Sequence, residues 1–483
     1  MGVEKCATLE VRRGRIQETR QTTPLMNQMT IPNLNKHDSY KYLGINQALE
    51  IRTSEMKELF KQKLYKRVSL LLKSKLNFKS LFTAINIWAV PSITYSFGVL
   101  TWSVTELREI DRGLRTMLTR YGVHHPHSST IRLYLPRQHG GRGLLNLESV
   151  HERDIISLRA YFLGDNSPFF SAIREADDRL SPLRLSESSH QDTRRPQEGL
   201  IEEWRSKALH GRYPGLLESR DVNKVESLTY LRAGYLFPET EGRLLAIQDQ
   251  VMQTRMYLKH IAQQNIPTDR CRKCSQRPES IQHLTSSCPI LAPKDYLGRH
   301  NSMAKIYHQQ MALKLGLIQD ELQQHLYVPK ALLQNATYNM YWDGTLVTDR
   351  AVAHNRPDIT LFDKVRKTCL LIEFTIPADD NITRAYSEKV TKYTDLAFQL
   401  RKMYALESVS VLPMIISVNG MVERHLIENT QRLCLDKDII SASQKQDNSE
   451  GSARTVAAAS AVTIRPAVAD YFPYYFLFCS SMD

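Results

Sequence analysis

Four potential metal-binding side chains are closely spaced in residues 271–288, and they constrain the fold more than any other feature of the chain. The stretch CRKCSQRPESIQHLTSSC contains Cys271 and Cys274 in a Cys-x-x-Cys turn, followed by His283 and Cys288. Such a turn presents two thiolates, and a His and a Cys on a following helical turn complete a tetrahedron around zinc. Because four protein ligands leave no open position for water, we expect a structural zinc site. The alternative is a pair of surface thiols beside an unrelated histidine.

The remaining cysteines do not indicate a disulfide framework. The chain has 7 cysteines, an odd number at uneven spacing, and this usage favours a reducing compartment. The N-terminal stretch MGVEKCATLEVRRGR has no apolar signal segment, and Asn, Pro, Ser and Thr interrupt the longest apolar stretch at 81–100. We therefore expect neither secretion nor a membrane span.

Positive charge is concentrated in one part of the chain. The 64 Lys+Arg and 51 Asp+Glu give a formal charge of +13, and residues 51–120 contribute 13 basic and 5 acidic side chains, a surplus of +8. A basic field attracts phosphate whatever its sequence, so we expect a nucleic-acid partner before a membrane. The candidate contacts are Lys57, Lys61, Lys73 and Arg112. A solvated helix face is the alternative interpretation.

The pattern of apolar residues changes along the chain. Short strand-like pieces come first, and helical spacing follows from 54 to about 120, broken at Pro91. Residues 180–200 are polar and rich in Ser, Pro and Arg, which is typical of a linker or loop. After about residue 341, β-branched runs flank a helical stretch at 386–404. This order predicts a small α/β domain near the C-terminus.

Two acids mark the strands of that domain. Asp358 begins one apolar run, and Glu373 lies inside the next, in LLIEF. A hairpin between the runs would place both carboxylates at one end of a sheet, where they could hold Mg²⁺ for attack on a phosphate. The next helix offers Lys389, Lys392 and Tyr393. A salt bridge from Glu373 to either lysine, with no metal, is the rival explanation for a buried acid.

Several stretches together resemble a known family. YKYLGI, LYLPRQHGGRGLLNLE, the Cys-Cys-His-Cys knuckle followed by RHN, and RPD…IEF…EKVTKY occur in this order. The order is similar to that of the C-terminal half of non-LTR retrotransposon polyproteins that carry a restriction-like endonuclease, and the resemblance covers roughly residues 1–435.

The resemblance implies a multidomain α+β chain with a mostly helical thumb and linker, a small zinc knuckle and an α/β nuclease domain of the PD-(D/E)XK type. The expected segments are a remnant of the reverse-transcriptase palm at 1–50, a helical thumb at 51–165, a helical linker at 166–265, the zinc knuckle at 266–310, the nuclease at 311–440 and a weakly structured tail at 441–483.

Carried over by position, the resemblance assigns the site residues. Asp358 and Glu373 become Mg²⁺ ligands, Lys389 becomes the helix-borne catalytic lysine, and Tyr393 follows it by four positions. Arg299 and His300, in the RHN stretch, are expected to contact nucleic acid. One departure is that the second acid is often Asp in relatives and is Glu here, a longer ligand.

The polymerase motif of that family is missing. A reverse transcriptase needs an aromatic-x-Asp-Asp turn, but the Asp-Asp pairs here, Asp177-Asp178 and Asp379-Asp380, lie far downstream of YKYLGI. We therefore expect a truncated protein with zinc and magnesium as cofactors, a DNA target and element RNA as partners, and a nuclear location. Target nicking is the expected activity. The alternatives are a catalytically inactive nucleic-acid-binding remnant or domesticated protein, and a helical scaffold with accidental motifs.

Overall fold

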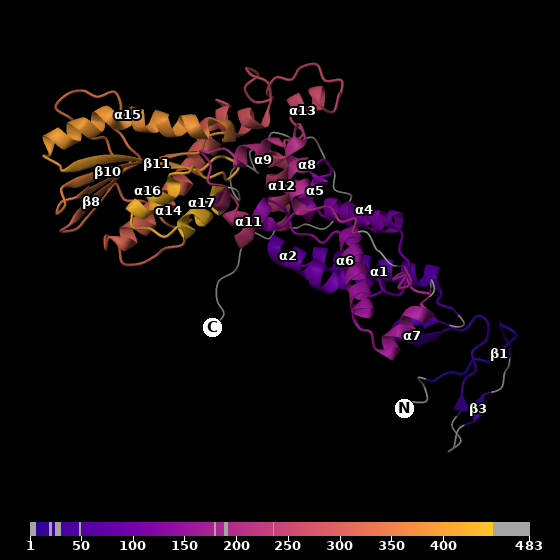
Figure 1. The fold of residues 1–483 in the computed structure, drawn as a ribbon. Helices are drawn as coiled ribbons and strands as arrows, with labels where there is room; N and C mark the ends of the chain where they lie inside the picture. Colours follow the sequence, from indigo (N-terminus) through magenta and orange to yellow (C-terminus); the bar gives the residue numbers. More distant parts are fainter. Residues whose placement is uncertain are drawn as a thin grey trace. The chain divides into compact units, whose positions relative to one another are not determined.

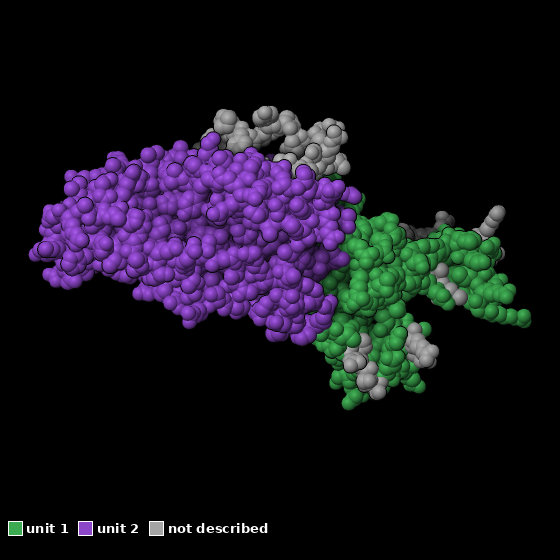
Figure 2. Space-filling view, turned by 90° about the horizontal axis from the view of Figure 1, so that it is seen from above, with its two compact units in different colours: residues 1–74, 84–114, 145–194 green, residues 75–83, 115–144, 195–483 purple. Residues whose placement is uncertain are grey.

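The computed structural model describes residues 6–18, 22–24, 30–47, 50–177, 180–187, 192–234 and 236–447. The chain is a mixture of helices and sheet and divides into two compact units (Figure 2). Unit 1 contains residues 1–74, 84–114 and 145–194, and unit 2 contains 75–83, 115–144 and 195–483. These units do not coincide with the segments expected from the sequence. Of the expected tail, 441–447 is helical and the rest lies outside the described residues.

Unit 1 begins with three short antiparallel hairpins, which agree with the strand-like pieces expected there. They pair β1 (Val11–Arg12) with β2 (Arg15–Ile16), β3 (Thr23–Pro24) with β4 (Thr30–Ile31), and β5 (Tyr40–Tyr42) with β6 (Ile45–Gln47). Leu43 and Gly44 join the last pair with φ of 47° and 85°. Two successive positive φ angles suit the tight turn of a twisted hairpin, and glycine adopts one of them without strain.

Helices form the rest of unit 1. The elements are α1 (Thr53–Leu72), the π-helical turn η2 (Ile85–Ala89), α3 (Pro91–Thr94), α4 (Val104–Arg120, which continues into unit 2), α6 (Leu147–Gly164) and α7 (Pro168–Ala176). Helix α1 buries Met56, Phe60, Leu64 and Val68, which lie four residues apart on one face. The expected break at Pro91 is the start of α3, where a missing N–H costs nothing.

Short helices form the first part of unit 2. They are α2 (Phe78–Ala84), α5 (Thr130–Tyr134), η3 (Arg137–His139), α8 (Gln197–Ser206), α9 (Arg212–Leu217), α10 (Lys224–Ser227), α11 (Thr229–Ala233), α12 (Pro238–Gln248) and α13 (Arg255–His260). Their core gathers around Trp204, Tyr213 and Tyr230 and includes Ile382 and Met421. Residues of the expected linker and of the expected nuclease therefore share one core.

A five-stranded sheet in the order β11-β10-β9-β8-β7 forms the other part of unit 2. The strands are β7 (Leu332–Gln334), β8 (Tyr338–Trp342), β9 (Ile359–Asp363), β10 (Thr368–Thr375) and β11 (Ser408–Ile415). All neighbours are antiparallel except β10 and β11, which are parallel. Helix α15 (Ile382–Met403) connects this parallel pair, as a parallel connection requires.

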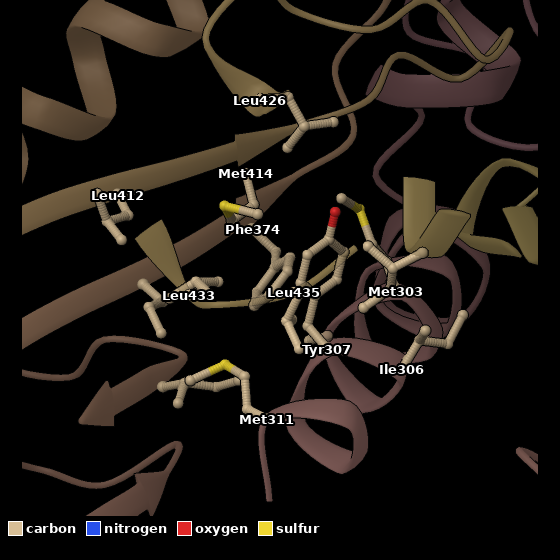
Figure 3. Packing of buried hydrophobic residues seen from close by; sticks show 14 of the residues in the cluster. Met303, Ile306, Tyr307, Met311, Phe374, Leu412, Met414, Leu426, Leu433 and Leu435 are labelled. Atoms are coloured by element: carbon tan, nitrogen blue, oxygen red, sulfur yellow. The ribbon is translucent and has the colours of Figure 1, made fainter. Parts of the chain in front are cut away.

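Helices cover both faces of this sheet (Figure 1). On one face, Leu396 and Leu400 of α15 pack with Leu371 of β10. On the other, side chains of α14 (Leu297–Lys314), among them Tyr307, pack with Phe374 of β10, together with residues from α16 (Leu426–Arg432) and α17 (Asp438–Asp447) (Figure 3). Because β10 is covered on both faces, its residues 369–372 are all apolar. No helix in the described part of the chain is long and apolar enough to cross a membrane.

The position of Leu371 between β10 and α15 makes a stability prediction. Its side chain is fully buried, so Leu371→Ala should lower the free energy of unfolding by about 2 to 5 kcal/mol through lost contacts and a cavity. The exposed Val347 is the control, because it is 80% exposed and Val347→Ala should change stability by less than about 0.5 kcal/mol. Urea unfolding followed by tryptophan fluorescence measures both, and equal losses would contradict the assigned packing.

Candidate functional site

The four predicted zinc ligands converge in the structure. One ligand atom from each of Cys271, Cys274, His283 and Cys288 lies within 4.8 Å of all the others. Cys274 Sγ and His283 Nε2 are 3.2 Å apart. Thiolates and imidazole are the donors that zinc prefers, so this group could bind a metal such as zinc.

Local backbone structure explains why these four side chains meet. The Cys271 N–H donates to the Arg277 carbonyl, and the Ser275 N–H donates back to the Cys271 carbonyl, which closes the turn. Ser275 adopts a left-handed φ of 56° inside this turn. His283 begins the π-helical turn η4 (His283–Ser287), and Cys288 follows its end. Burial, and then the charge of Arg277, lowers the pKa of His283, which favours the neutral imidazole that a metal requires.

The two predicted acids lie at the same end of adjacent strands. Ile359 of β9 pairs with Ile372 of β10 in antiparallel register, so Asp358 lies beside Glu373. The Asp358 N–H points at Glu373 Oε2 over 3.4 Å. The Phe374 N–H donates to Asp358 Oδ2 at 2.7 Å. Asp358 is therefore held by the backbone of the strand that carries Glu373.

Two lysines of α15 reach the Glu373 carboxylate. Lys389 Nζ and Lys392 Nζ lie 2.7 and 3.1 Å from Glu373 Oε1. The Glu373 side chain is 4% exposed, while those of the lysines are 22% and 33% exposed, so the cluster opens toward solvent on the side of the helix. The spacing of three residues places both amines on one helix face. The salt bridge considered as a rival from the sequence is thus present, with both lysines.

Tyr393 lies beside this cluster, with its hydroxyl near Glu373. Its hydroxyl donates to the Arg356 carbonyl at 3.0 Å, and Lys392 Nζ is 4.6 Å from its ring centroid. Burial first, and then the negative charge of Glu373, raises the pKa of the phenol, so it stays protonated at neutral pH. The Tyr393 hydroxyl therefore supports the backbone that precedes Asp358, and its expected part in catalysis stays a prediction.

Arg299 and His300 do not lie on an exposed surface, although the sequence suggested nucleic-acid contacts. Arg299 is 4% exposed, and its guanidinium donates to the Thr285 carbonyl. The His300 side chain is 14% exposed, with Nε2 3.1 Å from Asp358 Oδ2. Burial lowers the pKa of His300, but the hydrogen bond and charge of Asp358 outweigh burial and raise it. Sequence reasoning missed this contact because 58 residues separate the two partners.

The carboxylate pair offers fewer ligands than the cysteine cluster does. Within the described ranges, the Cys271 cluster is the one place where three or more Cys, His, Asp or Glu ligand atoms lie so close together. Carboxylates are suitable ligands for Mg²⁺, which commonly takes only one or two of them and completes its coordination with waters and substrate phosphates. Asp358 and Glu373 fit that pattern in donor chemistry.

The basic residues predicted in unit 1 fall into two groups. Lys57 Nζ lies 2.7 Å from Glu106, and Lys61 lies 3.6 Å from Glu109, so both amines are in ion pairs. Lys73 and Arg112 are exposed. Sequence reasoning did not single out the exposed Lys63 and Lys66, which lie on α1. The pairs with Glu106 and Glu109 could not be read from the sequence, because these two acids belong to a different helix, α4.

Comparisons with known proteins add no assignment. No protein-family model matches the chain, and no curated protein matches it.

The cysteine cluster should bind one metal ion per chain. Co²⁺ added to the metal-free protein should give the absorption bands of tetrahedral thiolate coordination, and Zn²⁺ should displace it. Cys271→Ser should weaken binding strongly, because it replaces one of the four ligands, a fully buried thiol. The exposed Cys434 provides the control, and Cys434→Ser should leave the Co²⁺ spectrum unchanged. An unaltered spectrum in Cys271→Ser would exclude the site.

Proposed function

We propose that this chain is a Mg²⁺-dependent endonuclease that nicks DNA, supported by a structural zinc knuckle and basic helices that bind nucleic acid. The observation that carries the proposal is the meeting of Asp358, Glu373 and Lys389 at one end of β9 and β10. This constellation, with the order of motifs along the chain, supports a nuclease of the PD-(D/E)XK type that derives from a non-LTR retrotransposon polyprotein. A nuclear location and element RNA as a second partner belong to the same proposal.

Each residue of the cluster has a defined part in this proposal. Asp358 and Glu373 would hold Mg²⁺, which supplies a bound water of lowered pKa and neutralises charge on the phosphate. Among the described residues, His300 and the Phe374 N–H both bond to Oδ2 of Asp358, so Oδ1 is the oxygen that we assign to a ligand. Lys389 and Lys392 stabilise negative charge that develops on the scissile phosphate. Buried Glu373 fixes both amines near the reacting group.

A catalytically inactive nucleic-acid-binding protein is the second candidate. It is favoured by the ion pairs themselves, because Lys389 and Lys392 already compensate the buried charge of Glu373 without a metal. In that case Asp358 and Glu373 would be structural, and removal of the Asp358 charge would leave nucleic-acid binding unchanged.

Replacement of Asp358 separates the two candidates. Asp358→Asn keeps an oxygen that can accept from the Phe374 N–H but removes the charge, so nicking of supercoiled plasmid with Mg²⁺ should fall at least about 100-fold. Plasmid binding and the unfolding midpoint should stay close to those of the parent. Asp395→Asn, at an exposed position of α15, is the matched control. If the parent does not nick, the inactive binding protein replaces the endonuclease. If the parent nicks and Asp358→Asn nicks equally well, the assignment of Asp358 as a metal ligand is wrong.

Nucleic-acid binding by unit 1 should depend on the exposed lysines of α1. Replacement of Lys63 and Lys66 by Gln should weaken binding to a DNA duplex and reduce the slope of log K against log salt by about 2, roughly one unit per phosphate contact. Lys57→Gln is the control, because its amine is held by Glu106 and should contribute little to binding. If Lys57→Gln reduces the slope as much as Lys63→Gln or Lys66→Gln does alone, this assignment is contradicted.

A further inference from the structure

The first turn of α14 connects the cysteine cluster with the acid pair. Helix α14 begins at Leu297, nine residues after the ligand Cys288, and the π-helical turn η5 (Ala292–Tyr296) lies between them. Two neighbouring residues of the first turn of α14 contact different sites. Arg299 donates to the Thr285 carbonyl of η4, and His300 contacts Asp358. Thr285 lies two residues after the ligand His283. The two sites are thus linked through a single helical turn.

His300 contacts the Asp358 carboxylate and the backbone of the neighbouring strand. Its Nε2 lies 3.1 Å from Asp358 Oδ2 and 3.2 Å from the Phe374 carbonyl. Both of these atoms accept hydrogen bonds, so Nε2 carries the hydrogen. Together with the Phe374 N–H at 2.7 Å, the imidazole fixes Oδ2 from two sides. A carboxylate held in this way presents its other oxygen in one direction.

Further contacts hold the start of α14 in place. The Tyr296 and Thr375 hydroxyls are 3.2 Å apart, which joins the residue before α14 to the end of β10. Met303 and Tyr307, one and two turns further along α14, are buried in the core that also contains Phe374. His300 therefore sits on a helix that the sheet holds at one end and the cysteine cluster holds through Arg299.

We propose that His300 is a positioning residue that holds the Asp358 carboxylate for phosphodiester cleavage, and that Arg299 makes this position depend on the cysteine cluster. The proposal rests on the endonuclease function proposed above. It takes the place of the expected contact of these two side chains with nucleic acid, because Arg299 is buried and only 14% of the His300 side chain is exposed.

Single-turnover nicking of supercoiled plasmid by the zinc-loaded full chain tests the role of His300. His300→Leu removes the donor at similar volume and should slow nicking about 10- to 100-fold, the usual effect of losing a partner of a metal ligand. The Mg²⁺ concentration for half-maximal rate should rise, whereas the Kd for plasmid should not change. His300→Gln places an amide N–H near the position of Nε2 and should retain most of the rate. A fold defect alone would not produce this pattern.

Arg299→Met tests the link to the cysteine cluster. The single variant Arg299→Met should nick more slowly than the parent but still bind one Zn²⁺. The double variant with His300→Leu should nick only slightly more slowly than His300→Leu alone, because both changes release the same Asp358 carboxylate. Lys314→Met, at an exposed position of α14, is the control and should nick as the parent does. Independent, multiplicative losses from Arg299→Met and His300→Leu would overturn the link.

The outcomes also separate this inference from the function on which it rests. If the parent nicks and His300→Leu nicks as fast with the same Mg²⁺ requirement, the positioning role is wrong and the endonuclease stands. If His300→Leu weakens plasmid binding as much as it slows nicking, His300 contacts DNA as first expected and the inference is again wrong. If the parent itself does not nick, the proposed function fails and the inference fails with it.

Discussion

The buried carboxylate of Glu373 is the constraint on which the sheet end of unit 2 depends. An ionised carboxylate taken out of water costs several kcal/mol unless partners compensate it. Here the compensation comes from Lys389 and Lys392 on α15, the helix that crosses from β10 to its parallel neighbour. The crossover that the parallel pair requires is therefore also the element that supplies the positive charge. Strand pairing then brings Asp358 to the same place.

The glycine-rich stretch at 139–143 is explained by packing in unit 2. A Cβ on Gly141 would lie 2.0 Å from the Leu135 carbonyl oxygen, so no other residue fits there without moving the backbone. Beside this loop, the buried Arg132 donates to the Gly140 carbonyl and pairs with the buried Asp249 at 3.1 Å. A motif that contributed to the family resemblance thus has a structural cause, and the loop need not contact a ligand to account for its sequence.

The two candidate sites differ in what the protein provides. The cysteine cluster presents four donors, enough to complete a tetrahedral ion without water. The acid pair presents two carboxylates beside two amines, so any Mg²⁺ there would take its remaining ligands from water and phosphate. In the proposed function, the first arrangement has a role in folding and the second takes part in the reaction. The first turn of α14 places Arg299 against one and His300 against the other.

The sequence by itself determined the features that depend on local spacing. These are the convergence of Cys271, Cys274, His283 and Cys288, the helical character of residues 54 to 120, and the strand pair that brings Asp358 beside Glu373. Only the tertiary structure decided which charges are already paired and which polar side chains are buried. Lys57 meets an acid 49 residues away, and His300 meets Asp358 over 58 residues. Such partners follow from how helices pack on a sheet and on one another, and no local pattern of residue types encodes them.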